Sequence, residues 1–187
     1  MKIILLNGPK SVGKDAIADA YKNVSRGVRP VSILPMVRAM HENALAEYGL
    51  QPESVDLINR TGCKDKPSGT LGGKTPREVY IEYGDKMRSK YGEYVFGDMW
   101  LKRAASIAPE KNGVIIVPDV RFQPEVNSAI RLAGRDNVML VYVIRPGKSW
   151  FGDIGRFCEH DWSCTFLNNG PLDELGDKFE NAINEAW

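Results

Sequence analysis

Residues 8–15 read Gly-Pro-Lys-Ser-Val-Gly-Lys-Asp, in which the glycines and the second lysine have the spacing G-x-x-x-x-G-K. The short apolar run 3–6 precedes this segment, and an amphipathic pattern of helical period follows it over about 13–24. Glycines let the chain curl so that successive backbone N–H groups point inward, and the start of a helix adds the positive end of its dipole. We therefore predict a phosphate-binding loop between a buried strand and a helix.

The predicted loop supplies the candidate residues for binding the phosphates of a nucleotide. Lys14 brings a point charge that can bridge two neighbouring phosphates. Asp15 stands where such loops usually carry a Ser or Thr hydroxyl, and its carboxylate can hold Mg²⁺ directly or through a bound water. A glycine-rich turn with an incidental lysine is the alternative, which the flanking strand and helix disfavour. The candidate phosphate-binding residues are Gly8, Lys10, Ser11, Val12, Gly13, Lys14 and Asp15.

Apolar runs recur along the chain, and helical patterns separate them. A continuous apolar run is typical of a strand buried on both faces, as in a parallel sheet. Besides 3–6, strands are expected at 31–34, 114–117, 138–144 and 164–167. Helices are expected at about 13–24, 36–48, 76–91, 95–107, 123–133 and 172–186. This alternation predicts an α/β fold of the P-loop NTPase class, with a doubly wound, mainly parallel five-stranded sheet and helices on both faces.

The length of 187 residues suits a single domain over residues 1–187. Within it we predict a helical insertion at about 35–110 and a lid loop at about 145–160. Residues 63–74 are rich in Lys, Gly, Pro and Ser, and residues 146–159 carry three glycines. Both segments are therefore predicted to be exposed loops that cover a site.

The composition disfavours several classes of function. A formal net charge of +1 gives no general signal for binding nucleic acid, so any phosphate-binding charge must be local. Three irregularly spaced cysteines and two histidines do not form a zinc motif, and the cysteines are expected to be free thiols. The apolar run at the start of the chain is too short for a signal peptide or a membrane span. We therefore expect a cytoplasmic protein that binds neither nucleic acid nor a membrane.

A second carboxylate follows the apolar run 114–117. Asp119 would lie at the C-terminal end of a core strand beside the phosphate-binding loop, where it could orient the waters of Mg²⁺ or position the acceptor oxygen. Arg121 would lie two residues further on, in the crevice outside the strand ends where α/β sheets bind ligands. Lys14, Asp119 and Arg121 are therefore candidate catalytic residues. A surface turn that carries an Asp–Arg pair is the alternative.

One helix start is well marked in the sequence. The segment Thr75-Pro76-Arg77-Glu78 combines an N-cap threonine, a proline at the first helical position and a glutamate three residues after the cap. Arg77 and Arg88 are separated by close to three helical turns, so they share one face with their Cα atoms roughly 16 Å apart. A planar guanidinium can bind phosphate oxygens bidentately, so both arginines are candidates for binding an acceptor. The alternative is a solvated basic face.

Arg145 and Arg156 flank or lie within the predicted lid. Closing such a loop would bring positive charge onto a transferring phosphoryl group and expel water. Arg145 is a candidate for binding the nucleotide, and Arg156 is a candidate for catalysis. An exposed basic loop is the alternative.

Four motifs occur together: Gly8…Gly13-Lys14-Asp15, Thr75-Pro76-Arg77-Glu78, Tyr83-Gly84-Asp85…Arg88 and Asp119-Val120-Arg121-Phe122…Glu125. In combination they resemble phage-type deoxynucleoside monophosphate kinases, over most of the chain up to the turn at 168–170. The resemblance implies ATP and Mg²⁺, with transfer of the γ-phosphoryl group to a dNMP to give dNDP and ADP. It implies the host cytoplasm if a phage encodes the chain, and it leaves open whether the chain forms a homodimer.

The resemblance also implies where the acceptor binds. Residues 32–38 are implied to line its pocket, and Arg38 stands where related chains often carry a lysine. A nucleobase needs an apolar or aromatic wall, which Tyr80, Tyr83 and Phe122 could provide. The candidate substrate-binding residues are Arg38, Lys66, Arg77, Tyr83, Arg88 and Arg121.

Two other functions stay open. Animal-type phosphomevalonate kinases resemble the chain in their Gly-Lys-Asp loop, arginine-rich helix and length, and their acceptor is also a phosphorylated small molecule. A non-catalytic nucleotide-binding module is the alternative from another class, which the presence of Lys14, Asp15 and Asp119 disfavours. A GTPase would need an Asn/Thr-Lys-x-Asp motif, and the sequence contains none.

Overall fold

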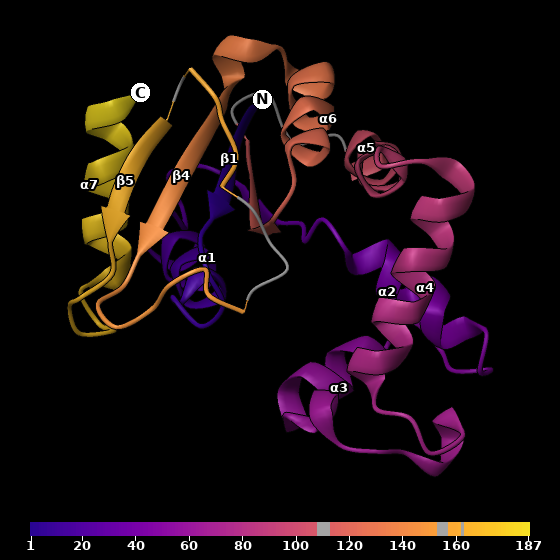
Figure 1. Ribbon diagram of the computed structural model, residues 1–187. Helices are drawn as coiled ribbons and strands as arrows, with labels where there is room; N and C mark the ends of the chain where they lie inside the picture. Colours follow the sequence, from indigo (N-terminus) through magenta and orange to yellow (C-terminus); the bar gives the residue numbers. More distant parts are fainter. Residues whose placement is uncertain (108–112, 153–156, 162) are drawn as a thin grey trace. The chain divides into compact units, whose positions relative to one another are not determined.

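The computed structural model describes residues 1–107, 113–152, 157–161 and 163–187 (Figure 1). These residues fold as two compact units. Unit 1 comprises Met1–Met36 with Leu101–Trp187, and unit 2 comprises Val37–Trp100. The predicted helical insertion overlaps unit 2, and the single domain over the whole chain stays a prediction. None of the helices in the described residues is long and apolar enough to span a membrane.

Unit 1 is built on a parallel sheet. Its strands are β1 (Lys2–Asn7), β2 (Val31–Ile33), β3 (Val114–Val120), β4 (Val138–Ile144) and β5 (Ser163–Leu167). They lie in the order β2-β3-β1-β4-β5, and every pairing is parallel. The central strand β1 has a neighbour on both sides, in agreement with its unbroken apolar run. The predicted five-stranded sheet is confirmed, and β3 is longer than expected because Val120 still pairs with Asn7.

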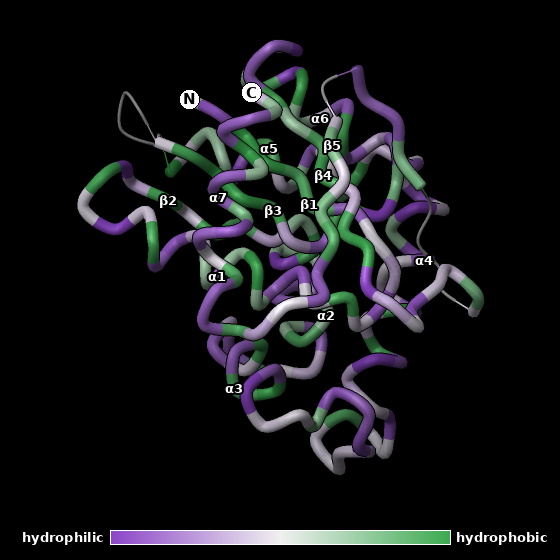
Figure 2. The backbone as a smooth tube through the Cα atoms, turned by 90° about the vertical axis from the view of Figure 1, so that its left-hand side faces the viewer, coloured by the Kyte–Doolittle hydropathy of each residue, from purple (hydrophilic) through white to green (hydrophobic). Residues whose placement is uncertain are grey.

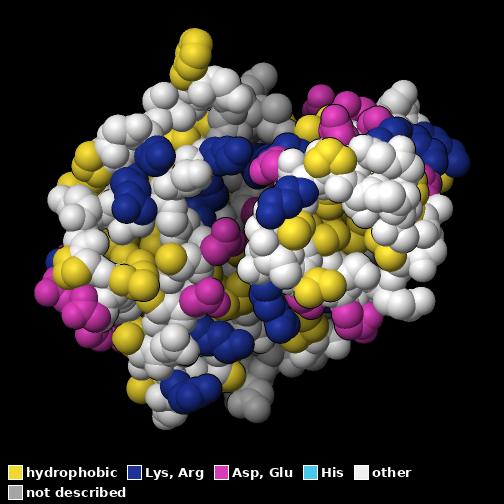
Figure 3. Space-filling view, turned by 90° about the horizontal axis from the view of Figure 1, so that it is seen from below, with side chains coloured by type: hydrophobic (Ala, Val, Ile, Leu, Met, Phe, Trp, Pro, Cys, Tyr) yellow, Lys and Arg dark blue, Asp and Glu magenta, His cyan; other side chains and the backbone are white. Residues whose placement is uncertain are grey.

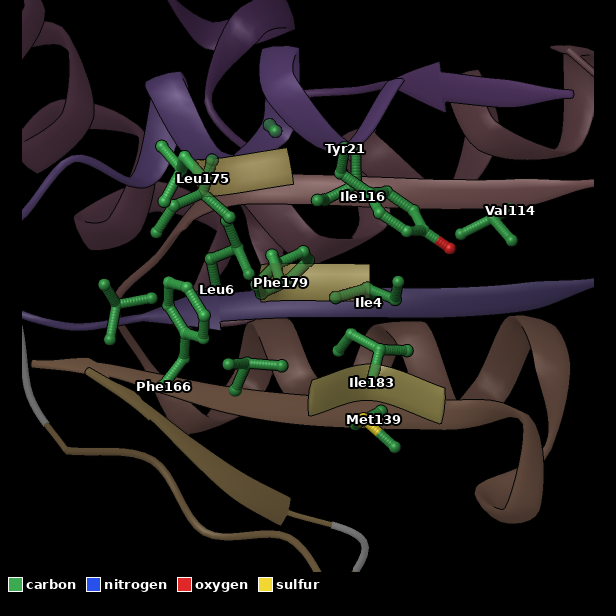
Figure 4. Close-up of a cluster of buried hydrophobic side chains, with 14 of the residues drawn as sticks. Ile4, Leu6, Tyr21, Val114, Ile116, Met139, Phe166, Leu175, Phe179 and Ile183 are labelled. Atoms are coloured by element: carbon green, nitrogen blue, oxygen red, sulfur yellow. The ribbon is translucent and has the colours of Figure 1, made fainter. Parts of the chain in front are cut away.

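Helices cover both faces of this sheet. Those of unit 1 are α1 (Lys14–Val24), α6 (Gln123–Ala133) and α7 (Leu175–Ala186). On one face, Ile4, Ile116 and Met139 of the strands pack with Tyr21 of α1 and Phe179 of α7 (Figure 4). On the other face, α6 packs against β1 and β4 (Figure 1). Hydrophobic residues run along β1, β3 and β4 (Figure 2), and the doubly wound α/β fold is confirmed.

The chain just before β5 packs against β4 and α6. The Tyr142 hydroxyl donates to the Cys158 carbonyl oxygen at 2.7 Å, and the rings of Tyr142 and Phe157 stack with centroids 4.2 Å apart. Gln123, the first residue of α6, exchanges two hydrogen bonds with the backbone of Glu159, at 2.9 and 2.8 Å. The described end of the predicted lid is therefore bound to the body of unit 1.

Unit 2 is helical. Its helices are α2 (Arg38–Ala46), α3 (Ser54–Thr61), α4 (Pro76–Tyr91) and the first part of α5 (Val95–Ile107), with 3-10 turns η1 (Cys63–Asp65) and η2 (Gly69–Leu71). The core gathers apolar side chains of α2 and α4 with Val55 and Phe96. At the start of α4, the Glu78 N–H donates to Thr75 Oγ1 at 3.1 Å, and the Thr75 N–H donates to the Glu78 carboxylate at 2.8 Å. This reciprocal cap confirms the predicted helix start.

The segment 63–74, predicted as an exposed loop, is mostly exposed but is more structured than predicted. It contains two 3-10 turns, and the Leu71 side chain is buried in the core of unit 2. The helix α3 was also not predicted. The polar and glycine-rich composition of this segment indicates exposure, but burial of one apolar side chain fixes its middle to the core.

Candidate active site

The phosphate loop, as we call Gly8 to Asp15, leaves β1 and enters α1. A Cβ atom on Gly8 would lie 2.5 Å from a carbonyl oxygen of β4, and one on Gly13 would lie 2.5 Å from Asn168 Nδ2. Both positions therefore require glycine. Gly13 has a φ of 93°, and Ser11, at 63°, is the one non-glycine residue with positive φ in the described part of the chain. Residues in this conformation turn neighbouring N–H groups toward one side, which makes a concave site for an anion.

Lys14 begins α1 at the end of the phosphate loop. Its ammonium group donates to the carbonyl oxygens of Gly8, at 2.5 Å, and Pro9, at 2.8 Å. A phosphate bound in the loop would replace these neutral acceptors with anionic oxygens, which bind an ammonium more strongly. The positive end of the α1 dipole lies at the same place. The loop therefore combines the Lys14 cation with the positive potential of the helix start.

The other loop candidates differ in exposure. Lys10, Ser11 and Asp15 are exposed, whereas the Val12 side chain is buried in the core of unit 1. Val12 can therefore contribute to phosphate binding only through its backbone. Asp15 lies in the first turn of α1, where a carboxylate also interacts favourably with the helix dipole.

Asn168 supports the phosphate loop and was missed by reasoning from the sequence. It follows β5, and it is buried. Its Nδ2 donates to the Val12 carbonyl oxygen at 2.7 Å, and its backbone N–H donates to the Ile144 carbonyl oxygen at 2.8 Å. These bonds tie the loop to the ends of β4 and β5. The sequence signal that could have indicated Asn168 is a polar residue directly after an apolar strand.

Asp119 lies at the end of β3, beside the start of the phosphate loop. The pairing of Leu5 with Val117 and of Asn7 with Val120 places it next to the end of β1. Its Oδ1 accepts the N–H of Met36 at 2.6 Å, which orients the carboxylate from the side of β2. Parallel strands present their carboxyl ends at one edge, so Asp119 and the phosphate loop share that edge.

The turn from β3 to α6 carries Arg121 and is held by a buried glutamate. Glu125 Oε2 accepts the N–H groups of Arg121, at 2.7 Å, and Phe122, at 3.1 Å. Burial raises the pKa of Glu125 to about 7, and the negative charge of Asp119 acts in the same direction. The two N–H bonds and the Arg121 charge oppose this rise in pKa without cancelling it. The Arg121 side chain is itself half-buried.

One of the two candidate arginines of the lid lies beside the phosphate loop. Arg145 follows β4, and its Nη1 lies 3.9 Å from where a Cβ atom on Gly13 would be. Arg156 lies outside the described residues. Lid movement stays a prediction, and at the described end any movement would have to break the bonds of Cys158 and Glu159 to β4 and α6.

The candidate arginines of unit 2 each have a carboxylate partner. Arg38 pairs with Glu42 at 2.5 Å and binds Asp56 through two nitrogens. Arg77 binds Asp65 through Nε and Nη2. Figure 3 shows that Lys and Arg side chains are interspersed with Asp and Glu side chains on one face of the molecule. An acceptor phosphate would therefore compete with carboxylates for these arginines.

Arg88 lies beside Gly84 on α4. Its Nη1 lies 3.5 Å from Asp85 Oδ1, and its guanidinium lies 4.8 Å from the centre of the Phe96 ring. A Cβ atom on Gly84 would lie 3.6 Å from Arg88 and 3.8 Å from Phe96. These are ordinary van der Waals distances, so a small side chain at position 84 would still leave room for Arg88.

Two candidates for a nucleobase wall are positioned differently. Tyr80 is buried in the core of unit 2, and its ring stacks on His41 with centroids 3.9 Å apart. The idea that Tyr80 faces a base is therefore wrong, because its ring is enclosed within the core. Tyr83 is only half-buried, and Lys66 is exposed between the two 3-10 turns. Both remain accessible to a ligand of unit 2.

The candidate Mg²⁺ ligands are two carboxylates, Asp15 and Asp119. No group of three or more His, Cys, Asp or Glu side chains suited to a metal occurs in the described ranges. This donor set fits Mg²⁺, which keeps several waters and is usually held by one or two carboxylates together with substrate phosphates. It does not fit a metal that needs a complete protein cage.

The solved structures that are similar to this chain include two kinases. A sugar kinase from Janibacter sp. shares 13% sequence identity at a TM-score of 0.46, and the alignment covers 98% of this chain and 95% of that one. A gluconokinase from Sinorhizobium meliloti shares 10% identity at a TM-score of 0.43, with 98% and 95% covered. No protein-family model and no curated protein matches the chain. Similarity at this level supports no conclusion about substrate.

The fold can be assigned from the chain itself. The parallel order β2-β3-β1-β4-β5 places the first strand at the centre of the sheet. A phosphate loop connects this strand to the first helix, and Asp119 lies near the C-terminal end of the neighbouring strand β3. This combination is the α/β fold of the P-loop NTPases.

Proposed function

We propose that this chain is a kinase that moves the γ-phosphoryl group of ATP onto the phosphate of a deoxynucleoside monophosphate. One observation carries the proposal: the Lys14 ammonium lies against the backbone of the phosphate loop, and Asp119 is the last residue but one of the adjacent strand β3. A loop of this kind supports binding of nucleotide phosphates, and the carboxylate supports use of Mg²⁺. The motif resemblance described above supports the choice of acceptor.

In the proposed reaction, an oxygen of the acceptor phosphate attacks the γ-phosphorus of ATP. The bond from the γ-phosphorus to the bridging oxygen breaks, and ADP leaves with its electron pair. Lys14 and the loop N–H groups stabilise the charge that moves onto the bridging oxygen, and Arg145 and Arg121 add positive charge at the same sheet edge. Asp119 and Asp15 would hold Mg²⁺, which neutralises phosphate oxygens when bound.

Arg77 is the best candidate for binding the acceptor phosphate. Its side chain is 36% exposed and that of its partner Asp65 is 64% exposed, and such surface pairs contribute about 0–1 kcal/mol. A bidentate phosphate can therefore displace Asp65 at small cost. Arg38 is less available, because it is 18% exposed and bonded to two carboxylates. We propose that Arg38 shapes unit 2 and does not bind the phosphate.

A second acceptor class stays in competition because of Tyr80. Burial of Tyr80 in the core of unit 2 removes one of the three aromatic side chains considered for a base. A phosphorylated acceptor without a base, such as phosphomevalonate, needs only anion-binding groups. The cations of unit 2 suit such an acceptor as well as they suit a dNMP.

An assay of ADP release over a panel of acceptors tests the proposal. The purified chain, ATP and Mg²⁺ are incubated with dAMP, dGMP, dCMP, dTMP, the four ribonucleotides and phosphomevalonate, each separately. The Lys14→Met variant, purified identically, controls for contaminating kinases. We expect turnover with at least one dNMP. Turnover of phosphomevalonate alone would refute the choice of acceptor, and ATP binding without any turnover would refute the kinase assignment.

A further inference from the structure

Two consecutive peptide groups between β3 and α6, Val120–Arg121 and Arg121–Phe122, are held by two buried side chains. The carbonyl oxygen of Val120 accepts a hydrogen bond from Asn7 Nδ2 at 3.0 Å. The N–H groups of Arg121 and Phe122 donate to Glu125 Oε2. Asn7 is fully buried and Glu125 is 3% exposed. The turn after Asp119 is therefore fixed by side chains from β1 and from α6.

Asn7 joins this turn to two other parts of unit 1. It is the last residue of β1 and directly precedes Gly8 of the phosphate loop. Its Oδ1 accepts the N–H of Cys158 at 3.3 Å, and its Nδ2 lies 3.6 Å from Cys158 Sγ. One carboxamide thus links the start of the loop, the end of β3 and the chain before β5.

We propose that Asn7 and Glu125 are positioning residues: by holding the turn after β3, they fix the positions of Asp119 and Arg121 relative to the phosphate loop. The inference rests on the proposed kinase function. Neither side chain is exposed, so both act through the backbone that they hold. Displacing a reacting group by about 1 Å can cost about a hundredfold in rate. A turn whose two successive peptide groups are both held by buried side chains resists such displacement.

A purely structural role is the competing explanation, because glutamates near the start of a helix commonly bond free N–H groups there. Two replacements of Glu125 separate the explanations. The Glu125→Gln variant loses the charge but keeps a side-chain oxygen that can accept both N–H groups. The Glu125→Leu variant keeps a similar volume and loses the acceptor.

The first test compares turnover in these variants. We expect Glu125→Leu to lower kcat about thirtyfold or more while the KM for ATP stays within about threefold of wild type. Glu125→Gln should retain kcat within about threefold. Asn7→Ala should behave like Glu125→Leu, and the double variant should lose less than the product of the single losses, because both side chains hold the same turn. If Glu125→Leu does not fold, Asn7→Ala carries the same expectation.

Ser128→Ala is a matched control on α6. Ser128 is buried, and its hydroxyl donates to the Pro124 carbonyl oxygen at 3.0 Å within the same helix. Its loss should affect α6 and leave the turn and kcat unchanged. A fall in kcat equal to that of Glu125→Leu would attribute the effect to general weakening of α6 and would overturn the proposal.

The second test needs no turnover. Hydrogen exchange by NMR should show the Arg121 and Phe122 amides exchanging at least about tenfold faster in Glu125→Leu, with wild-type protection in Glu125→Gln. Unchanged exchange in Glu125→Leu, or equal loss of kcat in the Gln and Leu variants, would overturn the proposal. If wild type transfers phosphate to no acceptor, the kinase assignment fails. The amide exchange rates, together with ATP–Mg²⁺ affinity measured by calorimetry, then still decide whether Asn7 and Glu125 position the turn that carries Arg121.

Discussion

Replacing Glu125 by glutamine should change how the stability of the protein depends on pH. Glu125 is almost fully buried, and its carboxylate accepts two backbone N–H groups. Burial, with the charge of Asp119 adding to it, raises the pKa from an ordinary 4.5 to about 7. Between about pH 4.5 and 7, the folded protein therefore retains a proton on Glu125 that the unfolded chain has already released.

The sign and size of the effect follow from this difference in pKa. Between about pH 4.5 and 7 the native state binds more protons than the unfolded state, so the free energy of unfolding falls as the pH rises. At about 1.4 kcal/mol per pKa unit, the loss amounts to about 3 kcal/mol by pH 8. The Glu125→Gln variant has no proton to release here. Relative to wild type, it should therefore gain about 3 kcal/mol between about pH 4.5 and 8.

Urea unfolding followed by circular dichroism, repeated in steps from about pH 4.5 to 8, measures both curves. Taking the difference between the two proteins removes the titrations that they share. Glu185→Gln, at an exposed position of α7, controls for the loss of one carboxylate. Parallel curves for wild type and Glu125→Gln would show that Glu125 ionises alike in the folded and unfolded chains. That result would refute the reasoning from burial.

Three further predictions concern the phosphate loop and its neighbours. Lys14→Met should lower kcat about a hundredfold or more, a loss of roughly 3 kcal/mol of transition-state stabilisation; near-normal steady-state turnover by a folded variant would contradict the role of Lys14. In Mg²⁺ titrations of activity, Asp119→Asn should be more damaging than Asp15→Ser, because serine restores the usual ligand; equal damage would mean that the two acids are ranked wrongly. Asn168→Ala should lower the free energy of unfolding by about 1–3 kcal/mol and weaken ATP binding in calorimetry, because it leaves a loop carbonyl without its buried donor. Asn169→Ala is its control, and equal effects of the two would contradict the support that we assign to Asn168.

Elements with a strong local pattern could be predicted from the sequence. The buried strands β1, β3 and β4 are unbroken apolar runs, and the start of α4 is marked by Thr75, Pro76 and Glu78. The short helix α3 could not be predicted in this way, because its eight residues include an exposed Leu57 and the buried Val55. Such a helix depends on packing more than on its own pattern.

The candidate site likewise contains parts that could be predicted from the sequence and parts that could not. The phosphate loop is a local feature, because its glycines, lysine and following helix are adjacent in the sequence. The residues that hold it are not local: Asn168 binds a carbonyl 156 positions earlier, and Asn7 binds one 113 positions later. Glu42 lies four residues after Arg38 on α2, a spacing that a helix brings together. Asp56 and Asp65, the other partners of Arg38 and Arg77, could not be predicted, since no spacing rule links an arginine to a carboxylate across a loop.

The contacts of the phosphate loop in unit 1 and the arginine–carboxylate pairs of unit 2 differ in how easily a ligand can replace them. In unit 1, Asn7, Glu125 and Asn168 are buried and bond to backbone groups, and losing such a partner costs about 1–3 kcal/mol. In unit 2, the Arg77–Asp65 pair is exposed and contributes about 0–1 kcal/mol. In the proposed function, a nucleotide that binds the phosphate loop of unit 1 therefore meets a geometry that is already fixed. If an acceptor phosphate binds Arg77, as proposed, it meets an ion pair that it can replace. The charge pattern of unit 2 alone therefore does not select one acceptor over another.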